Sequence, residues 1–223
     1  MLIIGDVHGC FKTLQALLAK CPKDNVCFVG DLIDRGPLSA DVVQFIIDNG
    51  YHCVRGNHEQ MMIDAYKETS NGLSKDSDGY GDWYDIWLCN GGKETLLSYE
   101  KKDTFIKHRE WMKKLPLFKR FHIDGKRLFV SHAGLSGYNE KFKDNFRGME
   151  KDIMWHRDYQ YIPNGYFSVF GHTPKPNYVL NVKDRWCNTD TGAFRKRTFS
   201  TMYGVLTAIQ FPSLQIFQQE NID

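Results

Sequence analysis

The sequence predicts an α/β fold built on a mostly parallel sheet with helices on its faces. Over the first seventy residues, strand-like runs at 2–4, 26–29 and 51–55 alternate with three segments of helical periodicity. Such alternation is the pattern from which parallel sheets are built. Each strand-like run also leads directly into a cluster of glycine and polar residues. In an open α/β sheet, ligands bind beyond the carboxyl ends of the strands, so these clusters predict the position of a site.

Periodicity assigns the N-terminal elements one by one. The run at 2–4 is short and wholly apolar, as in a strand buried on both faces. In the segment 11–20, Phe11, Leu14 and Leu18 recur at helical spacing and form one apolar face. Asn49-Gly50 is a helix-ending signal. The expected order is strand 2–4, helix 11–20, strand 26–29, helix 41–48, strand 51–55 and a helix that begins at 56–57 and runs through 67.

The rest of the chain is more varied. Residues 70–85 mix glycines with small, polar and aromatic residues and predict a long surface loop. Residues 137–165 are polar and aromatic with little periodicity. Helices are expected at 93–101 and 103–115, and strands at 117–122, 126–131, 166–170, 203–210 and 213–219. We therefore expect one domain over 1–223, a sandwich of two mixed β-sheets flanked by helices (α/β/β/α), with irregular insertions near 70–90 and 137–168.

Composition excludes several classes of function. The 29 lysines and arginines nearly balance the 27 aspartates and glutamates, and no basic block is present, which argues against a nucleic-acid partner. No apolar stretch approaches the roughly 18 residues of a membrane span, and the apolar run at the N-terminus is too short for a signal peptide. The cysteines form no CxxC pair and indicate a reducing compartment. We expect a cytoplasmic monomer without a membrane partner.

Five polar clusters stand at the expected strand ends. They are GDVHG (5–9), GDLIDRG (30–36), RGNHE (55–59), SHAG (131–134) and GHTP (171–174). Together they supply oxygen and imidazole donors without a thiolate: Asp6, His8, Asp31, Asn57, His132 and His172. This donor set suits manganese, iron or zinc. Six donors are too many for one tetrahedral ion but suit two ions that share a carboxylate, and such a pair activates a bridging water for attack on phosphorus.

These clusters resemble the phosphoprotein phosphatase family of metallophosphoesterases, and most closely its compact bacterial and phage members, typified by the bacteriophage lambda protein phosphatase. The similarity is densest over 3–64. It recurs at WLCNGG (87–92), FVSHAG (129–134), IMWHR (153–157) and DTGA (190–193). The resemblance implies the calcineurin-like metallophosphoesterase sandwich and two divalent ions, with Mn²⁺ expected first and Fe or Zn as alternatives.

The resemblance also implies a role for each residue of the clusters. Asp6 and His8 would bind the first ion and Asp31 would bridge, while Asn57, His132 and His172 would hold the second. His58 matches the family's proton donor to the leaving group, and Asp34 matches the carboxylate beside it. Arg35, Arg55 and Arg157 match arginines that contact phosphate. These roles are chemically coherent, because a serine alkoxide leaves poorly without an acid and guanidinium groups bind phosphate in a bidentate way.

The expected activity is therefore that of a serine/threonine phosphoprotein phosphatase. Its substrate would be a phosphoprotein or phosphopeptide and its product inorganic phosphate, with phosphotyrosine and aryl phosphates as further substrates. One alternative is a dinucleoside polyphosphate hydrolase, since symmetrical dinucleoside tetraphosphatases look similar at the same clusters but usually carry Asp where this chain has Glu59. A second is a non-catalytic metal-binding module, which the complete set of ligands opposes.

Several further residues receive ordinary structural interpretations. His52, His108 and His122 are interpreted as structural. His156 is either structural too or lines the pocket, because it precedes Arg157. Asp190 and Thr191 are interpreted as turn residues, with support of the metal ligands as the alternative. Aromatic residues in the two irregular segments either line a peptide groove or pack the loops: Tyr80, Trp83, Tyr84, Trp155, Tyr159 and Tyr161.

Overall fold

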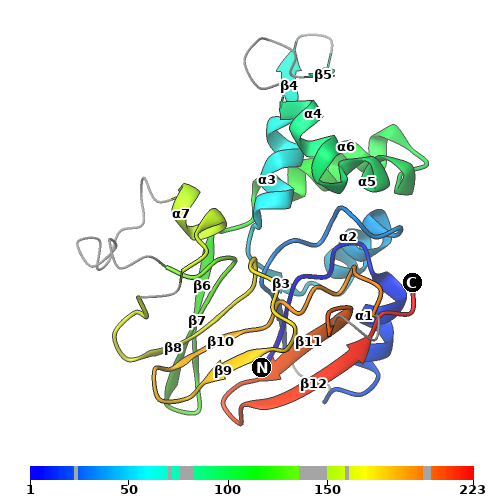
Figure 1. Ribbon diagram of the computed structural model, residues 1–223. Helices are drawn as coiled ribbons and strands as arrows, with labels where there is room; N and C mark the ends of the chain where they lie inside the picture. Colours follow the sequence, from blue (N-terminus) through cyan, green and yellow to red (C-terminus); the bar gives the residue numbers. More distant parts are fainter. Residues whose placement is uncertain (23–24, 70–71, 76–82, 136–149, 159–160, 198–201) are drawn as a thin grey trace.

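Two five-stranded mixed sheets stacked face to face form the centre of the protein (Figure 1). The computed structural model describes residues 1–22, 25–69, 72–75, 83–135, 150–158, 161–197 and 202–223. The first sheet has the order β12-β11-β1-β2-β3 and the second the order β6-β7-β8-β10-β9. The predicted sandwich of two mixed sheets is thus confirmed.

The first sheet contains the three N-terminal strands in parallel. Its members are β1 (Leu2–Ile4), β2 (Val26–Phe28), β3 (His52–Cys53), β11 (Val205–Gln210) and β12 (Gln215–Glu220). β2 pairs in parallel with both β1 and β3, whereas β11 runs antiparallel to β1, with Leu2 opposite Gln210. The parallel arrangement places the loops after β1, β2 and β3 at one edge of the sheet.

The second sheet repeats this arrangement with its own parallel centre. Its strands are β6 (Phe118–Ile123), β7 (Lys126–Ser131), β8 (Tyr166–Phe170), β9 (Val179–Asn181) and β10 (Trp186–Asn188). β7, β8 and β10 are parallel, and β6 and β9 close the sheet as antiparallel edges.

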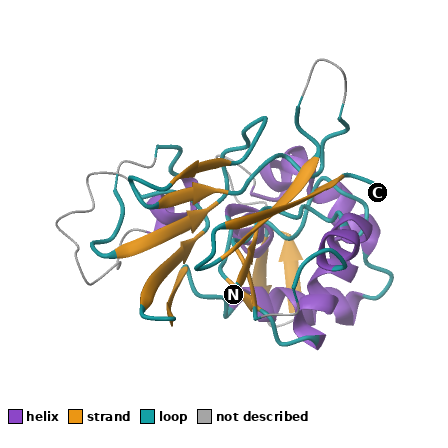
Figure 2. Cartoon of the chain, turned by 90° about the horizontal axis from the view of Figure 1, so that it is seen from below, coloured by secondary structure: helices purple, strands orange, loops and turns teal. Residues whose placement is uncertain are grey.

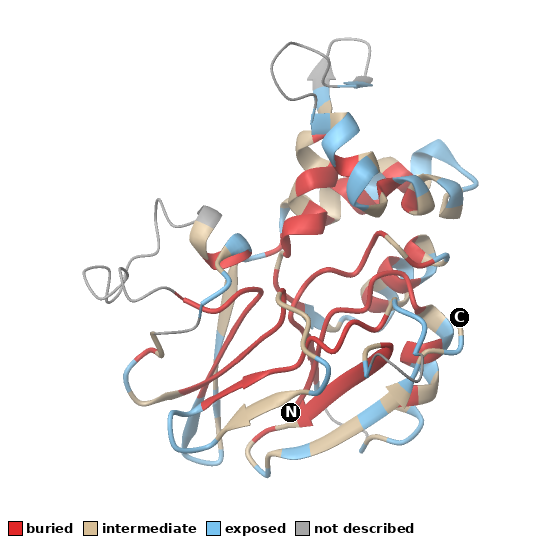
Figure 3. Ribbon diagram, in the orientation of Figure 1, coloured by how far each residue is buried: buried red, intermediate tan, exposed pale blue. Residues whose placement is uncertain are grey.

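Alternation along the strands divides the core into layers. Ile3 and Cys27 face the second sheet, where they join Val130 and Val169 in one buried cluster. The neighbours of Ile3 face the opposite way and pack with the helices. Each fully buried aliphatic side chain contributes about 1.5–3 kcal/mol relative to exposure. Buried residues continue into the loops that leave the strands, as the red loops in Figure 3 show.

Helices cover the outer faces of both sheets. They are α1 (Phe11–Leu18), α2 (Ser39–Asp48), α3 (Asn57–Asp64), α4 (Trp83–Trp87), α5 (Lys93–Ser98), α6 (Lys102–Lys113) and α7 (Glu150–Trp155), with a π-helix, η1 (Leu88–Gly92), between α4 and α5. Most of them gather to one side of the strands (Figure 2). α7 packs on the outer face of the second sheet, where Ile153 and Met154 contact Phe129. No helix in the described ranges is long and apolar enough to cross a membrane.

The structure corrects part of the predicted element list. The helix predicted to run through 67 ends at Asp64, and β4 (Tyr66–Thr69) follows it. The loop expected at 70–85 contains β5 (Gly72–Lys75), which pairs with β4, and the start of α4, while residues 70–71 and 76–82 lie outside the described ranges. The irregular segment 137–165 contains α7. β9 and β10 were missed because three residues are too few for periodicity to register.

The end of the chain caps the helix that follows the first polar cluster. Cys10 stands at the N-cap of α1 and makes no side-chain capping bond. The backbone N–H groups of Lys12 and Thr13 instead donate to the carboxylate of Asp223, each at 3.0 Å, and the Thr13 hydroxyl donates to it at 2.6 Å. A carboxylate at a helix N-terminus satisfies orphan donors and interacts favourably with the helix dipole.

We expect Asp223→Ala to lower the free energy of unfolding by about 1 kcal/mol, the typical effect of losing a helix cap. Urea unfolding monitored by circular dichroism measures the difference. The control is Glu100→Ala, which removes a carboxylate from an exposed position that caps no helix. Equal stability of the two variants would show that the Asp223 contacts contribute nothing.

Candidate metal centre

The five polar clusters meet at the carboxyl ends of the central strands. The loops after β1, β2 and β3 bring Asp6, His8, Asp31 and Asn57, and those after β7 and β8 bring His132 and His172. All six side chains are buried, with at most 7% of their surface exposed. The sequence-predicted ligands therefore converge, although they come from parts of the chain up to 166 residues apart, as the bond from the His172 backbone N–H to Asp6 shows.

Asp31 lies between two groups of ligand atoms. Its Oδ2 is 3.6 Å from His8 Nε2, and its Oδ1 is 3.3 Å from His132 Nε2. Asp31, His8 and His58 form one group of close donor atoms, and Asp31, His132 and His172 form another. Asn57 Oδ1 joins the second group, 2.8 Å from His132 Nε2 and 2.8 Å from His172 Nδ1. One carboxylate thus reaches both groups, as a bridging ligand must.

Backbone carbonyls select which nitrogen of each imidazole faces the centre. His8 Nδ1 donates to the Ile33 carbonyl and His132 Nδ1 to the Val29 carbonyl, both at 2.9 Å. His172 uses its other nitrogen, because Nε2 donates to the Trp155 carbonyl at 3.1 Å. A carbonyl can only accept, so the remaining nitrogen of each ring carries a lone pair directed at the cluster. This is the support that metal-binding histidines usually have.

The charge state of the cluster fits a divalent cation. Asp6 Oδ1 is buried without a hydrogen-bond partner among the described residues. Burial raises the pKa of Asp6 well above its usual range, and the charges of Asp190 and Asp31 raise it further. Burial lowers the pKa of His132 to about 3 and that of His172 to about 3, so both rings are held neutral. Neutral imidazoles bind metal, and a cation would remove the penalty on the carboxylates, so the residues present fit a pair of divalent ions.

Backbone strain is concentrated in the same loops. Asp31, Asp34, Arg35 and His172 all have positive φ angles, of 50°, 73°, 72° and 70°. Non-glycine residues rarely adopt this conformation, which costs of the order of 1–3 kcal/mol each and persists where the surroundings impose it.

Glu59 holds the loop that carries Asp31. Its carboxylate is fully buried and accepts from the backbone N–H groups of Asp31, Leu32 and Gly56 at 2.8–2.9 Å. Burial, followed by the charge of Asp31, raises the pKa of Glu59 to about 8. In the sequence, Glu59 served only to distinguish this chain from the symmetrical dinucleoside tetraphosphatases. In the structure, its carboxylate holds the loop that carries Asp31.

His58 and Asp34 form a closely bonded pair beside the cluster. His58 Nδ1 lies 2.6 Å from Asp34 Oδ2, and Nε2 lies on the cluster side, 3.8 Å from Asp31 Oδ2. Burial lowers the pKa of His58 to about 4, while the charge of Asp31 opposes the shift. The imidazole is thus oriented by one carboxylate with its second nitrogen free to serve a bound molecule.

The helices above the cluster support Asp34 and Arg35. Trp87 Nε1 and the Thr95 hydroxyl donate to Asp34 Oδ1 at 3.0 and 2.6 Å, and the Asp34 N–H donates to Thr95 Oγ1 at 2.8 Å. The Arg35 N–H donates to the Gly91 carbonyl at 3.1 Å. A Cβ at Gly91 would lie 2.7 Å from Arg35, so only glycine fits there. The sequence marked WLCNGG as a family segment without assigning these contacts.

The three predicted phosphate-binding arginines are placed differently. Arg35 lies in the cluster, with Nη1 2.7 Å from His8 Nε2. Arg157 is exposed, and its charge contributes to lowering the pKa of His172. The Arg55 guanidinium donates instead to Gln60 and to the carbonyls of Lys113 and Leu115, at 2.9–3.2 Å. Arg55 therefore stabilises the carboxyl end of α6, and its contact with phosphate stays a prediction.

Asp190 is more closely tied to the cluster than its turn-like sequence indicated. It is 97% buried, and its charge acts on Asp6. Its Oδ1 accepts from the Gly192 N–H at 2.9 Å, which is the expected turn contact. Burial raises its pKa to about 7. Its position beside Asp6 favours the alternative interpretation, in which it supports the ligands, and no sequence signal distinguishes this from ordinary turn chemistry.

The other histidines largely follow their structural interpretation. His108 is buried and bridges the Tyr99 hydroxyl and Gln44 Oε1, both at 2.9 Å, so it connects α6 to α2. Burial lowers its pKa to about 4. His52 packs on Phe121, and His156 Nε2 is buried without a partner among the described residues.

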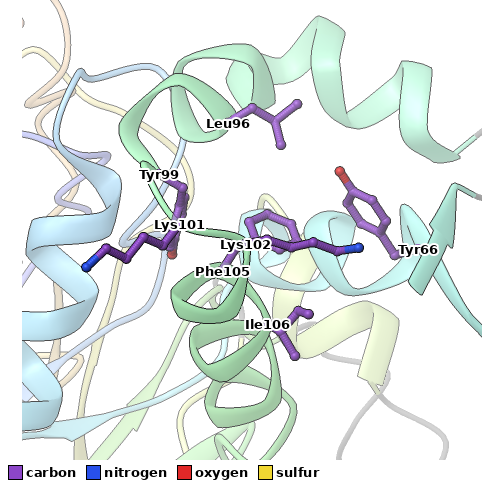
Figure 4. Close-up of a pocket in the computed structure, with 7 residues that line it drawn as sticks. All are labelled: Tyr66, Leu96, Tyr99, Lys101, Lys102, Phe105 and Ile106. Atoms are coloured by element: carbon purple, nitrogen blue, oxygen red, sulfur yellow. The ribbon is translucent and has the colours of Figure 1, made fainter. Parts of the chain in front are cut away.

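A separate apolar cavity of about 290 Å³ lies between the upper helices (Figure 4). Its aromatic wall consists of Tyr66, Tyr99 and Phe105, and Lys102 extends along it. None of the predicted ligands lines it. Of the aromatic residues predicted either to line a peptide groove or to pack the loops, Tyr84 packs on Tyr66 and Trp155 packs on His172, whereas Tyr80 and Tyr159 lie outside the described residues.

Comparison with known proteins identifies relatives over most of the chain. The model of the calcineurin-like phosphoesterase family matches residues 1–209. A symmetrical bis(5'-nucleosyl)-tetraphosphatase of Photorhabdus laumondii is 31% identical over 140 residues, 60% of this chain and 44% of that protein. Serine/threonine-protein phosphatase 1 of Salmonella typhimurium is 38% identical over 94 residues, 40% of this chain and 38% of that protein. The matches thus span less than half the length of these two relatives.

Solved structures with a similar fold include a protein phosphatase. A protein serine/threonine phosphatase from Saccharomyces cerevisiae superposes with a TM-score of 0.60 at 17% identity, covering 100% of this chain and 80% of that chain. At this identity the likeness supports the fold alone.

We expect Mn²⁺ to bind with release of a proton and more tightly as the pH rises from about 6 to 8. The metal-free folded protein retains a proton on the Asp6 and Asp190 pair, because both pKa values are raised, that of Asp190 to about 7. A raised carboxyl pKa stabilises the metal-free fold at low pH, and this contribution is lost as the pH rises through about 7. Calorimetry in buffers of different ionisation enthalpy measures the released proton.

The control for this measurement is Asp31→Ala, which removes the shared ligand and should abolish Mn²⁺ binding at both groups. An affinity that does not change with pH, or normal Mn²⁺ binding by the Asp31 variant, would contradict the proposed centre.

We expect Thr95→Val to lower the free energy of unfolding by about 1–3 kcal/mol, since it leaves a buried carboxylate with one donor fewer. Thr104→Val makes the same chemical change on α6, where the hydroxyl has no hydrogen bond to the described residues, and should cost less. Chemical denaturation measures the free energy of unfolding of both variants. Equal losses would mean that the bond to Asp34 does not stabilise the fold.

Proposed function

The chain belongs to the calcineurin-like phosphoesterase family, and we propose that it is a metal-dependent phosphatase of phosphoserine and phosphothreonine in proteins. The observation that carries the proposal is the His58–Asp34 pair next to the Asp31 cluster, with Nε2 of His58 directed at the cluster. Such a pair suits a substrate whose leaving group needs a proton, and a serine or threonine alkoxide is such a group.

We propose the ligand assignment that the resemblance implies. Asp6, His8 and Asp31 would hold one ion, and Asp31, Asn57, His132 and His172 the other. Two divalent ions, when bound, supply a nucleophile at neutral pH and neutralise charge on the phosphoryl oxygens. Mn²⁺ is the proposed metal, with Fe and Zn as the alternatives that this donor set accepts.

The side chains around the cluster then divide the remaining work. His58 would donate from Nε2 in its doubly protonated form, which the Asp34 carboxylate stabilises, and after the transfer to the leaving oxygen the neutral ring keeps Nδ1–H bonded to Asp34. Trp87 and Thr95 keep Asp34 fixed, so the imidazole does not have to be oriented during turnover. Arg35 and Arg157 bind phosphoryl oxygens, because guanidinium groups match the geometry and charge of phosphate.

Hydrolysis of dinucleoside polyphosphates is the second candidate function. It is supported by the Photorhabdus laumondii relative, which is named as a symmetrical bis(5'-nucleosyl)-tetraphosphatase. A phosphate leaving group needs less help from an acid than an alkoxide does, so the His58–Asp34 pair favours the phosphoester substrate. Glu59 also favours the phosphoester substrate, because symmetrical dinucleoside tetraphosphatases usually carry Asp at this position.

The remaining features of the proposal follow from the sequence. We propose a cytoplasmic monomer of the compact lambda type that takes a phosphoprotein or phosphopeptide, releases inorganic phosphate and needs no nucleic-acid or membrane partner. Phosphotyrosine and aryl phosphates would be accepted as well, because the cluster contacts the phosphoryl group.

We expect His58→Asn to lower kcat about 10²–10⁴-fold on a phosphoserine peptide and far less on 4-nitrophenyl phosphate. Asparagine keeps a hydrogen bond to Asp34 but cannot protonate the leaving oxygen, which a nitrophenolate does not require. Wild-type protein assayed beside it on diadenosine tetraphosphate ranks the two candidate substrates. Equal losses on the peptide and the aryl ester would refute the acid role, and turnover of the dinucleotide alone would refute the phosphoprotein assignment.

A further inference from the structure

The residues that follow the DTGA segment carry a basic run next to the cluster. Asp190 lies beside Asp6, and five residues later the chain reads Arg195-Lys196-Arg197. Arg195 received no role in the proposed reaction. Its backbone is held close to the site, because the Arg195 N–H donates to the Gly192 carbonyl at 2.9 Å.

The ring of Phe194 brings two guanidinium groups together. It contacts the His8 ring edge to face, with the ring centroids 5.1 Å apart. The guanidinium carbon of Arg35 lies 4.5 Å from the Phe194 centroid, and that of Arg195 lies 5.5 Å from the same point. Stacking of guanidinium on an aromatic face is favourable and limits the orientations that each arginine adopts. Arg195 is thus tied to the arginine that we assign to the phosphoryl group.

Arg195 is held by its stem while its charge stays accessible. Its guanidinium carbon also lies 4.5 Å from the Tyr203 ring centroid. A Cβ at Gly192 would meet Arg195 Cδ at 3.4 Å, so the stem packs over the loop that carries Asp190. The side chain is exposed, and no carboxylate in the described ranges pairs with it. Arg197 differs in this respect, because it forms an ion pair with Glu220.

The charge of Arg195 acts on Asp190, next to the metal cluster. Both Arg35 and Arg195 work against the rise in the pKa of Asp190 that burial causes. Two positive charges therefore act on one carboxylate beside Asp6. Arg35 is committed to the cluster through its contact with His8. Arg195 has no such contact with any residue that the structure describes, which leaves its donors available for an anion next to the scissile phosphate.

We propose that Arg195, stacked on Phe194 and Tyr203, binds a second phosphoryl group of the substrate beside the one that is hydrolysed. This inference rests on the proposed function, since it assumes that the cluster receives a phosphoryl group. The second phosphoryl group belongs either to a neighbouring phosphorylated residue of a peptide or to the next unit of a polyphosphate chain. A guanidinium recognises both by the same charge-assisted hydrogen bonds.

Steady-state kinetics of the Mn²⁺-loaded protein on three substrates tests the proposal. The substrates are a peptide with two adjacent phosphoserines, the matched peptide with one phosphoserine, and diadenosine tetraphosphate. Arg195→Gln should lower kcat/KM about tenfold on the doubly phosphorylated peptide, the dinucleotide or both, the effect of losing one charge-assisted hydrogen bond at an exposed site. The singly phosphorylated peptide should be hydrolysed almost as by the wild type.

Arg197→Gln is the matched control, because it removes one positive charge from the same run but from a residue already paired with Glu220. Arg195→Lys keeps the charge but loses the stacked, planar fork, and should fall between the wild type and Arg195→Gln. Fluorescence anisotropy of the labelled doubly phosphorylated peptide on metal-free protein gives a readout independent of turnover. There Arg195→Gln should bind more weakly than Arg197→Gln.

The outcomes separate this inference from the proposed function. A selective loss on the doubly phosphorylated peptide identifies the second phosphoryl group as that of a peptide, and a selective loss on the dinucleotide identifies it as part of a polyphosphate. Equal loss on all substrates, no loss on any, or the same loss in Arg197→Gln would overturn the subsite. Wild-type protein that hydrolyses no phosphopeptide would refute the phosphatase proposal. The effect of Arg195→Gln on kcat/KM for diadenosine tetraphosphate would still test the proposed role of Arg195.

Discussion

The arrangement of the site depends on one buried carboxylate, that of Asp31, which the surrounding residues must hold in place and compensate. Its oxygens face His8 on one side and His132 on the other, and it is 2% exposed. A buried charge is costly unless cations or donors surround it. Its backbone N–H donates to Glu59, and its Oδ1 accepts from the backbone N–H of His58 at 3.0 Å. The strained backbone at this residue is tolerated because these bonds determine its position from several sides.

The two sheets are needed because no single one carries both groups of ligands. Strand ends of the first sheet supply Asp31 and Asn57, and those of the second supply His132 and His172. The His132 ring is fixed by the Val29 carbonyl, at the end of a strand in the opposite sheet. Packing of the apolar layer between the sheets therefore decides the spacing of the proposed metal ligands. Core stability and site geometry are parts of the same structure.

The helices above the sheets act on a different part of the site. Trp87 and Thr95 bond Asp34, and Gly91 receives the N–H of Arg35. A π-helix lies at this point, and such irregular turns are common at functional sites. His58, the proposed acid, and Arg35, the proposed phosphate-binding arginine, are thus positioned by the helices, whereas the proposed metal ligands are positioned by the sheets. Phe194 connects the two parts through its contacts with His8 and Arg35.

The sequence by itself determined the order of the N-terminal strands and helices, the class of fold and the set of candidate donor residues. These are local properties, because periodicity and glycine-flanked polar clusters can be recognised within short stretches of the sequence. Tertiary structure alone decided that Glu59 shapes the Asp31 loop, that Asp190 lies beside Asp6 and that Asp223 caps α1. It also turned Arg55 toward the end of α6. Such contacts join residues far apart in the chain, and their partners are selected by packing, to which residue type and spacing give no guide.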